Sequence, residues 1–447
     1  MTLRKSIELS LLVGLSIYCN APAQVQEKSP TYQGLQLSLQ EIWQKAESQN
    51  KSLQIQQVQL EISEQHVKDS KAERLPEIRA HAEYARISNM PIYTNGPFNT
   101  PEHFPVLHNF YQITAESYLA LYHGNKINTA IETEEMAHKL AIEKRNQIAS
   151  ETRLKLAAIY LDLQRSLVFR DLINQHIHEA QRRLQHIQEL QKNGVVLKSD
   201  LLRAELQLSR QQMTLTEIEN SILLANQKLD LMIGLPDTTK IIPSEDLTTS
   251  QPIQAGYEAY LTEALEQAYP IHLADKETAI RELHIKEVRA GHLPKVGLFA
   301  NYTYSYPQIF LYPYMDAAYS IGKAGIRLSY SLSSLYHNRH KEEAAILEYK
   351  KQQLVKADTE DNIRQIVKES YVRYAEALKR IQVAELNIRQ SSENYRIVSN
   401  TFFNQLALLT DLLDADTQVL QSKFDLTTAQ TTAHLHYYQL LFTLGKL

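Results

Sequence analysis

Residues 294–306 read PKVGLFANYTYSY, and this stretch decides the fold because apolar and polar side chains alternate along it. Alternation with a period of two is the pattern of a β-strand that has one apolar and one polar face. Phe299 is the exception, an apolar residue on the polar face. The apolar face carries Val296, Leu298, Ala300, Tyr302, Tyr304 and Tyr306, and the polar face carries Gly297, Asn301, Thr303 and Ser305.

The same alternation occurs three more times. A return strand covers 324–332, after a loop containing Pro307 and Pro313, and a second pair of strands covers 77–84 and 111–121. Five tyrosines fall within 75–123 and eight within 293–337, out of 25 in the chain. Strands with an apolar outer face and flanking aromatic residues are typical of membrane β-barrels. A soluble sheet with one buried face is the alternative for the strands alone.

The two hairpins belong to two copies of one unit. Pro76 and Pro294, which precede the first strand of each hairpin, lie 218 residues apart. Asp200 in the stretch SDLL and Asp411 in the stretch TDLL lie 211 apart. Each copy reads in the same order as a helix, a strand hairpin, a very long helix, a turn and a last helix. Such a duplication predicts a pseudo-symmetric protomer.

The helical segments are too long for a compact domain. Residues 126–192 contain no proline and no glycine, and a helix of that length spans roughly 100 Å. The last helix of each copy has apolar residues seven apart, the spacing of a coiled coil. In the first copy these are Leu201, Leu208, Leu215, Ile222 and Leu229, and in the second they are Leu412, Val419, Leu426, Ala433 and Leu440. An ordinary four-helix bundle has the same spacing, but the strand hairpins argue against it.

Four strands per chain cannot close a transmembrane barrel, because about eight is the smallest known number and open edges are not left in lipid. The barrel must therefore be shared, and three chains supply twelve strands. The predicted fold class is mainly α with a β-barrel part. Long coiled-coil hairpins form an α-barrel, and four strands per protomer contribute to a 12-stranded transmembrane β-barrel in a trimer.

The predicted boundaries follow from these patterns. A signal peptide covers 1–23, the first repeat 24–235, a linker 236–256 and the second repeat 257–447. In the first repeat the hairpin covers about 76–122, the long helix about 126–192 and the last helix about 198–233. In the second repeat the corresponding ranges are about 294–336, about 338–404 and about 410–445.

Residues 1–23 predict export from the cytoplasm, because two basic residues precede the apolar run 9–17 and Ala21-Pro22-Ala23 has the pattern of a cleavage site. Cys19, the only cysteine, lies in this segment, and both lipidation and an inert role stay open. Beyond it, no stretch approaches the roughly 18–20 apolar residues of a membrane-spanning helix. The net charge of −4 gives no indication of nucleic-acid binding.

The chain resembles the TolC-like outer-membrane efflux proteins over essentially its whole length after the signal. The most specific pieces are LSLQEI at 37–42 with Asn50 following, Leu-Pro at 75–76 and 293–294, and TDLLDA at 410–415. The resemblance implies a homotrimer in the outer membrane of a Gram-negative bacterium, with a helical tunnel across the periplasm. It also implies passive export, driven by an inner-membrane pump that docks through a periplasmic adaptor protein.

The resemblance further implies a gate at the periplasmic end of the tunnel, lined by acidic residues at the positions of Asp411 and Asp414. Their i, i+3 spacing places both carboxylates on one face of a helix, and in a trimer they would form two rings around a narrow pore. The alternative is that Asp411 only caps its helix, as Asp200 would. An aromatic latch residue of the family is matched by Phe402, which has no hydroxyl. Two more positions depart from the family pattern, since a glycine is replaced by Gln405 and a basic residue by Ala407.

No catalytic motif is present in the sequence, so we expect no enzyme activity, no cofactor and no metal. Glu135 and His138 have the spacing of a di-iron ligand pair, but a second such pair is missing. A metal-dependent bundle enzyme and a periplasmic coiled-coil adaptor or scaffold are the rival functions. The scaffold explains the coiled coils but leaves the two tyrosine-rich hairpins unexplained.

Overall fold

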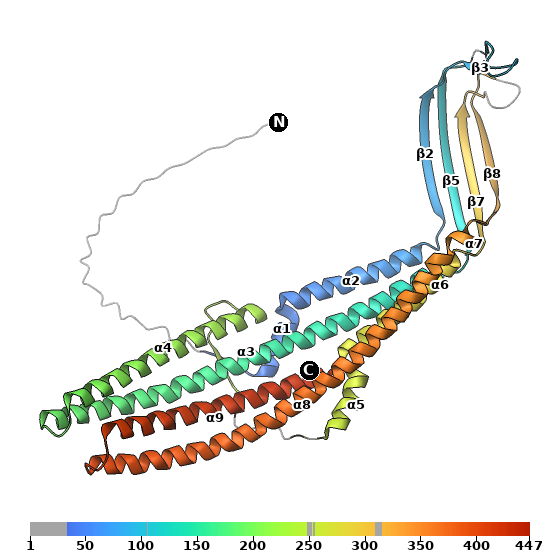
Figure 1. The fold of residues 1–447 in the computed structure, drawn as a ribbon. Coiled ribbons are helices and arrows are strands. Elements are labelled where there is room, and N and C mark those ends of the chain that lie inside the picture. Colours follow the sequence, from blue (N-terminus) through green and yellow to red (C-terminus); the bar gives the residue numbers. More distant parts are fainter. Residues whose placement is uncertain (1–33, 105, 248–252, 254, 309–314) are drawn as a thin grey trace, which may run out of the picture.

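The computed structural model describes residues 34–104, 106–247, 253, 255–308 and 315–447. The expected signal peptide and Cys19 lie outside the described residues. The molecule is elongated, with a β-sheet at one end and the turns of two long helical hairpins at the other (Figure 1).

The helices are α1 Leu39–Gln49, α2 Lys51–Ala72, α3 Lys126–Lys192, α4 Lys198–Ile233, α5 Tyr257–Gln267, α6 Tyr269–Ala290, α7 Ser334–His337, α8 Arg339–Phe403 and α9 Leu409–Thr443. The strands are β1 Leu35–Leu37, β2 Glu77–Arg86, β3 Met90–Ile92, β4 Glu102–Phe104, β5 Asn109–His123, β6 Ile241–Pro243, β7 Lys295–Tyr306 and β8 Tyr319–Ser329.

The main sheet is antiparallel, with the strand order β2-β5-β7-β8. The hairpin β2–β5 comes from the first repeat and the hairpin β7–β8 from the second, and β5 pairs with β7 to join them. The return strand ends at Ser329, earlier than expected, because residues 332–333 form a turn that leads into α7. Strands β3 and β4, in the connection between β2 and β5, were not predicted.

The two faces of the main sheet have the predicted chemistry. On one face the side chains of Thr114 and Ser305 are buried, and the Thr114 and Thr303 hydroxyls lie 3.2 Å apart. On the other face the apolar side chains remain exposed, with Ile78 at 74% and Ile326 at 70% of their full accessibility. Strands β2 and β8 form the two edges, and neither pairs with a second described strand. The protomer thus leaves one apolar face and two sheet edges unpartnered.

The opening helix of each repeat was predicted as continuous, and this was wrong. In the first repeat the break falls at Asn50, whose Oδ1 accepts hydrogen bonds from the Ser52 and Leu53 backbone N–H groups at 3.0 and 3.4 Å. A side chain that caps a new helix start stabilises a break of this kind. In the second repeat the break falls at Ala268, and Pro270, which cannot donate a backbone hydrogen bond, follows in the first turn of α6.

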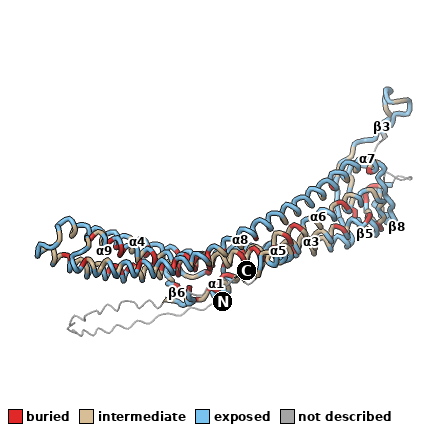
Figure 2. The backbone as a smooth tube through the Cα atoms, turned by 60° about the horizontal axis from the view of Figure 1, so that its bottom comes forward, coloured by how far each residue is buried: buried red, intermediate tan, exposed pale blue. Residues whose placement is uncertain are grey.

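The long helices form two antiparallel hairpins, α3–α4 from the first repeat and α8–α9 from the second, and they lie side by side because α3 packs on α9. With 67 residues, α3 is about 100 Å long. The buried residues form narrow seams between these helices, and the outward faces are largely exposed (Figure 2). A second row of residues seven apart on α4 is buried in the seam: Ala204, Gln211, Ile218 and Ala225.

The segment predicted as a linker, 236–256, contains a strand. Its β6 pairs in parallel with β1, with Gln36 opposite Ile242. The Ile241 N–H donates to Asn226 Oδ1 at 3.0 Å, and Tyr160 donates its hydroxyl to the Leu37 carbonyl at 3.1 Å. These contacts tie the junction of the repeats to the core between α1, α3 and α4. No period-two pattern could be recognised here, because both strands have only three residues.

Candidate functional site

The predicted gate residues lie at the end of the molecule opposite the sheet, where the two helical hairpins turn (Figure 1). Each turn contains one residue in the left-handed region, Gly194 with φ of 75° and Gln405 with φ of 62°. Glycine adopts this conformation freely, whereas a residue with a side chain is strained there. The two turns therefore share one backbone shape, although the second lacks the glycine.

Asp411 caps its helix. Its Oδ2 accepts a hydrogen bond from the Leu408 backbone N–H at 3.2 Å, and Asp200 makes the equivalent bond to the Leu197 N–H at 3.3 Å. A carboxylate at a helix N-terminus also interacts favourably with the helix dipole. The capping role weighed from sequence is thus present in both repeats. The cap uses only Oδ2 of Asp411, and Oδ1 takes no part in it.

Asp414 lies one turn further along α9 and is exposed, as is Asp411. Neither carboxylate has an ion-pair partner among the described residues. Two unpaired carboxylates on one face of a helix end concentrate cations and repel anions. The counterpart of Asp414 in the first repeat, Arg203, has the opposite charge, so the acidic pair belongs to the second hairpin alone.

Phe402 is buried in the apolar cluster at the tip, where it packs with Ile187, Ala204 and Leu412. Its ring joins the end of α8 to the first turn of α9 and to the neighbouring hairpin. The structure therefore gives this residue a packing role, and a role as a gate latch remains a prediction.

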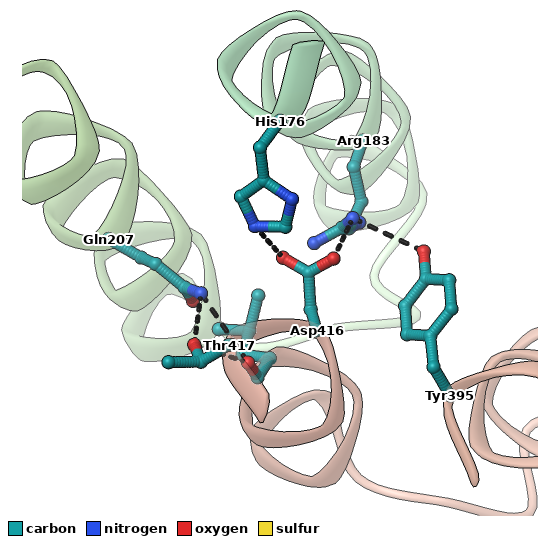
Figure 3. Close-up of polar contacts among 7 residues, drawn as sticks. His176, Arg183, Gln207, Tyr395, Asp416 and Thr417 are labelled. Atoms are coloured by element: carbon teal, nitrogen blue, oxygen red, sulfur yellow. Dashed lines mark hydrogen bonds and ion pairs between the residues drawn. The ribbon is translucent and has the colours of Figure 1, made fainter. Parts of the chain in front are cut away.

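A buried polar cluster, which we call the tip cluster, connects the two hairpins close to this site (Figure 3). It consists of His176 and Arg183 from α3, Tyr395 from α8 and Asp416 from α9. The Arg183 Nη2 donates to Asp416 Oδ1 at 2.7 Å and to the Tyr395 hydroxyl at 3.2 Å. His176 Nε2 lies 3.0 Å from Asp416 Oδ2. The tip cluster thus joins three helices and both repeats.

Three side chains of the tip cluster are almost fully removed from water. The side chains of Asp416, His176 and Arg183 are 3%, 8% and 9% exposed. Burial raises the pKa of the Asp416 carboxyl, but its contacts with His176 and Arg183 outweigh burial and hold that pKa below its ordinary value. A carboxyl with a lowered folded-state pKa contributes stability above its unfolded value of about 3.9 and loses it as the pH falls below that range. The Arg183–Asp416 pair is therefore intact at neutral pH.

A second polar contact joins the hairpins beside the tip cluster. Gln207 on α4 donates to the Thr417 hydroxyl at 2.9 Å and to the Leu413 carbonyl at 3.4 Å (Figure 3). Because Thr417 follows Asp416 on α9, both contacts hold the same turn of that helix. Asp416 and Thr417 lie two and three residues after the predicted gate residue Asp414 on α9.

The tip cluster was not predicted from the sequence. His176 and Arg183 are seven residues apart and so share a heptad position on α3. Two polar residues at one heptad position, each directly before an apolar residue of the seam (Ile177 and Leu184), were the signal that could have revealed it. Their counterparts 211 residues later are Asn387 and Asn394, and the counterpart of Asp416 is Glu205. The cluster therefore occurs once per protomer, although the hairpins occur twice.

The other candidate sites are not assembled. Glu135 forms an ion pair with Lys71 at 2.7 Å, and His138 Nδ1 lies 2.8 Å from the Ser63 hydroxyl. Among the described residues, no group of three or more histidine, cysteine or acidic side chains could hold a metal ion. No helix in the described ranges has the length and apolarity to cross a membrane.

Comparison with known families identifies what this architecture is similar to. The profile of the family described as outer membrane efflux protein matches residues 42–235 and 261–446, one segment in each repeat. None of the curated proteins matches the sequence significantly.

Solved structures share the fold at low sequence identity. The outer-membrane channel OprN has a TM-score of 0.76 and 15% identity, with 92% of this chain and 90% of that chain covered. VceC from Vibrio cholerae has a TM-score of 0.74 and 16% identity, with coverage of 91% and 96%. The CmeC channel of Campylobacter jejuni has a TM-score of 0.75 and 12% identity, with coverage of 91% and 85%.

Proposed function

The chain belongs to the outer membrane efflux protein family, and from this premise we propose that three copies form the exit duct of a tripartite efflux or type I secretion machine. The duct conducts substrates passively from an inner-membrane pump across the periplasm and the outer membrane. The observation that carries the proposal is the sheet, which has an exposed apolar face and two unpaired edges.

The proposed trimer follows from the apolar face and the two open edges of that sheet. An exposed apolar face of strands 10 to 15 residues long suits lipid. Unpaired backbone groups at a sheet edge are not tolerated in lipid, so each β8 has to pair with the β2 of a neighbouring copy. Three copies close twelve strands. The helical hairpins continue the ring for about 100 Å, which is long enough to cross an aqueous compartment.

The gate of the duct is formed by Asp411 and Asp414. In a threefold arrangement each residue supplies a ring of three carboxylates at the end of the tunnel, and such rings favour cations. The tip cluster and the packing of Phe402 hold the two hairpins together in the closed state. Opening requires the helix pairs to shift, so that the carboxylates of the three copies move apart.

The tips of the hairpins also fit a periplasmic adaptor protein as the docking partner. Leu197 and Leu408, 211 residues apart, are each 70% exposed, and Leu406 is 79% exposed. Because the two repeats present equivalent apolar turns, a trimer offers six similar docking positions to the adaptor. Apolar side chains at such positions are typical of protein interfaces.

A scaffold without a channel is the less favoured function. A scaffold would need only the coiled coils, and it would leave the apolar face of the sheet in water. The protein has no chemistry of its own in this proposal, since the pump supplies the energy and selects the substrate.

Conductance in planar bilayers tests the gate. We expect the double substitution Asp411→Ala and Asp414→Ala to raise the conductance or to weaken the preference for cations, because both carboxylate rings are removed. Asp200→Ala is the matched control, since it removes the same kind of helix cap from the other hairpin. Unchanged conductance and selectivity in the double variant would rule out the gate assignment.

A further inference from the structure

The polar face of the main sheet carries Phe299 on the interior strand β7, an apolar residue that the alternation along this strand does not explain. In the sheet it is opposite Tyr118 of β5 and Gly325 of β8. Its position is four residues into β7, about 13 Å from the helical end of that strand. The rings of Tyr118 and Phe299 therefore meet Gly297 and Gly325 in adjacent rows of this face.

The glycines make room for the aromatic rings. A Cβ atom built on Gly297 would lie 2.5 Å from the Tyr118 ring, and one built on Gly325 would lie 3.2 Å from the Phe299 ring. Each ring thus covers a glycine and lies against the sheet. A glycine in a strand interior weakens the strand and commonly marks a close approach of another group. The pairing of rings with glycines builds a flat aromatic surface on the inner face.

Arg327 completes this surface. Its guanidinium carbon lies 4.7 Å from the centre of the Phe299 ring, within the range of a cation–π contact. The side chain is exposed, and it forms no ion pair with any described residue. In a trimer a neighbouring copy would place its β2 beside β8, and acidic residues on β2 could compete for Arg327. One of them, Glu77, already accepts a hydrogen bond from Arg79 at 2.7 Å. The other, Glu83, lies six residues beyond Glu77, about 20 Å further along the strand.

A guanidinium held on a ring keeps its outer face and its N–H edge free. Its N–H groups match the oxygens of a carboxylate or sulfonate, and its plane and the neighbouring Tyr118 ring match an aromatic system. We propose that Tyr118, Phe299 and Arg327 form a binding site for planar aromatic anions on the inner wall of the barrel. This inference rests on the proposed duct, because only in the trimer does this face line a lumen that exported molecules pass.

Isothermal titration calorimetry with 2-naphthalenesulfonate, on the trimer purified in detergent, tests the site. We expect saturable binding and a dissociation constant that rises about tenfold or more in Arg327→Gln, because the charge-assisted hydrogen bonds are lost. Phe299→Leu should weaken binding about threefold by removing the ring that holds the guanidinium.

Lys323→Gln is the matched control. Lys323 is an exposed cation on the same face of the same strand, but it is opposite Asn301 instead of an aromatic ring. We expect its dissociation constant to remain within about twofold of the original, since Lys323 makes no cation–π contact with a ring in the described part of the chain. A trimer that does not bind the probe, or equal weakening by Arg327→Gln and Lys323→Gln, would overturn the site and leave the duct intact. Loss of the trimer itself would count against the duct.

Discussion

At the scale of single residues, the two repeats differ in the charges that they bury. Asp416 and Arg183 form a buried pair whose counterparts, Glu205 and Asn394, cannot form the same pair. Removing one partner from a buried ion pair is costly because the other charge is left without compensation. The packing of the two hairpins at the tip therefore depends on a contact that joins the first repeat to the second and has no symmetric equivalent.

Arg183→Met tests this dependence. We expect the free energy of local opening at the tip to fall by about 3 kcal/mol, because Asp416 loses its main counter-charge in a dry site. Hydrogen exchange of the amides near His176 should then be faster by roughly a hundredfold. Arg182→Met is the control, since Arg182 is the adjacent but exposed arginine. Similar exchange rates in the two variants would contradict a structural role for the pair.

Asp230 is a second buried acidic residue, and its counterpart in the second repeat is the apolar Leu441. Neither of its carboxylate oxygens has a hydrogen-bond partner in the described part of the chain. Burial, with a smaller contribution from Asp237, raises its pKa from 3.8 to about 6. The Asp230 carboxyl therefore stays protonated to a higher pH in the folded state than in the unfolded state. The free energy of unfolding is highest below about pH 4, where the carboxyl is neutral in both states, and it falls as the pH rises to 6.

We expect Asp230→Asn to be more stable than the original protein at pH 7, by at most about 3 kcal/mol. The difference should shrink as the pH falls from 6 to 4, because the original carboxyl then becomes neutral as well. Thermal unfolding of both proteins across this range measures it, and Asp69→Asn, at an exposed position on α2, is the control. A pH-independent difference would show that the charge of Asp230 is not the cause.

At the scale of elements, the main sheet is the part of the protein that lies in lipid in the proposed duct. On β5, Ala115 lies on the exposed apolar face and Glu116 on the polar face, one residue apart and therefore at nearly the same depth. Ala115→Arg should destabilise the membrane-inserted protein by about 2–4 kcal/mol if this row lies near the bilayer centre. Urea unfolding from lipid vesicles measures the loss.

Glu116→Arg is the matched control for that substitution, since it places the same side chain on the polar face. We expect this variant to insert and unfold like the original protein. If both arginines were equally tolerated, the apolar face would not be in contact with lipid.

The long elements could be predicted from the sequence because their patterns persist over many residues. Helix α3 has the bounds expected from the stretch without proline or glycine, Lys126–Lys192. The breaks at Asn50 and Ala268 were missed because each depends on one cap or one proline within a helical pattern. The tip cluster was missed because its members are up to 240 residues apart in the sequence, and only the packing of α3 against α8 and α9 brings them together.

At the scale of the whole molecule, the protomer is incomplete by itself. It carries a four-stranded sheet with two open edges, an exposed apolar face on that sheet, and helices about 100 Å long with largely exposed outer faces. Association of three copies in a closed ring would pair every sheet edge and cover the sides of the helices. It would also turn the apolar face of each sheet outward to lipid. The duct, the gate and the aromatic site on the barrel wall all depend on this ring.

The mass of the detergent-extracted protein from the outer-membrane fraction tests the ring most directly. Size exclusion with light scattering, corrected for bound detergent, should give three copies of the chain. A water-soluble monomer or dimer would leave the edges of β2 and β8 without partners, and it would contradict the duct.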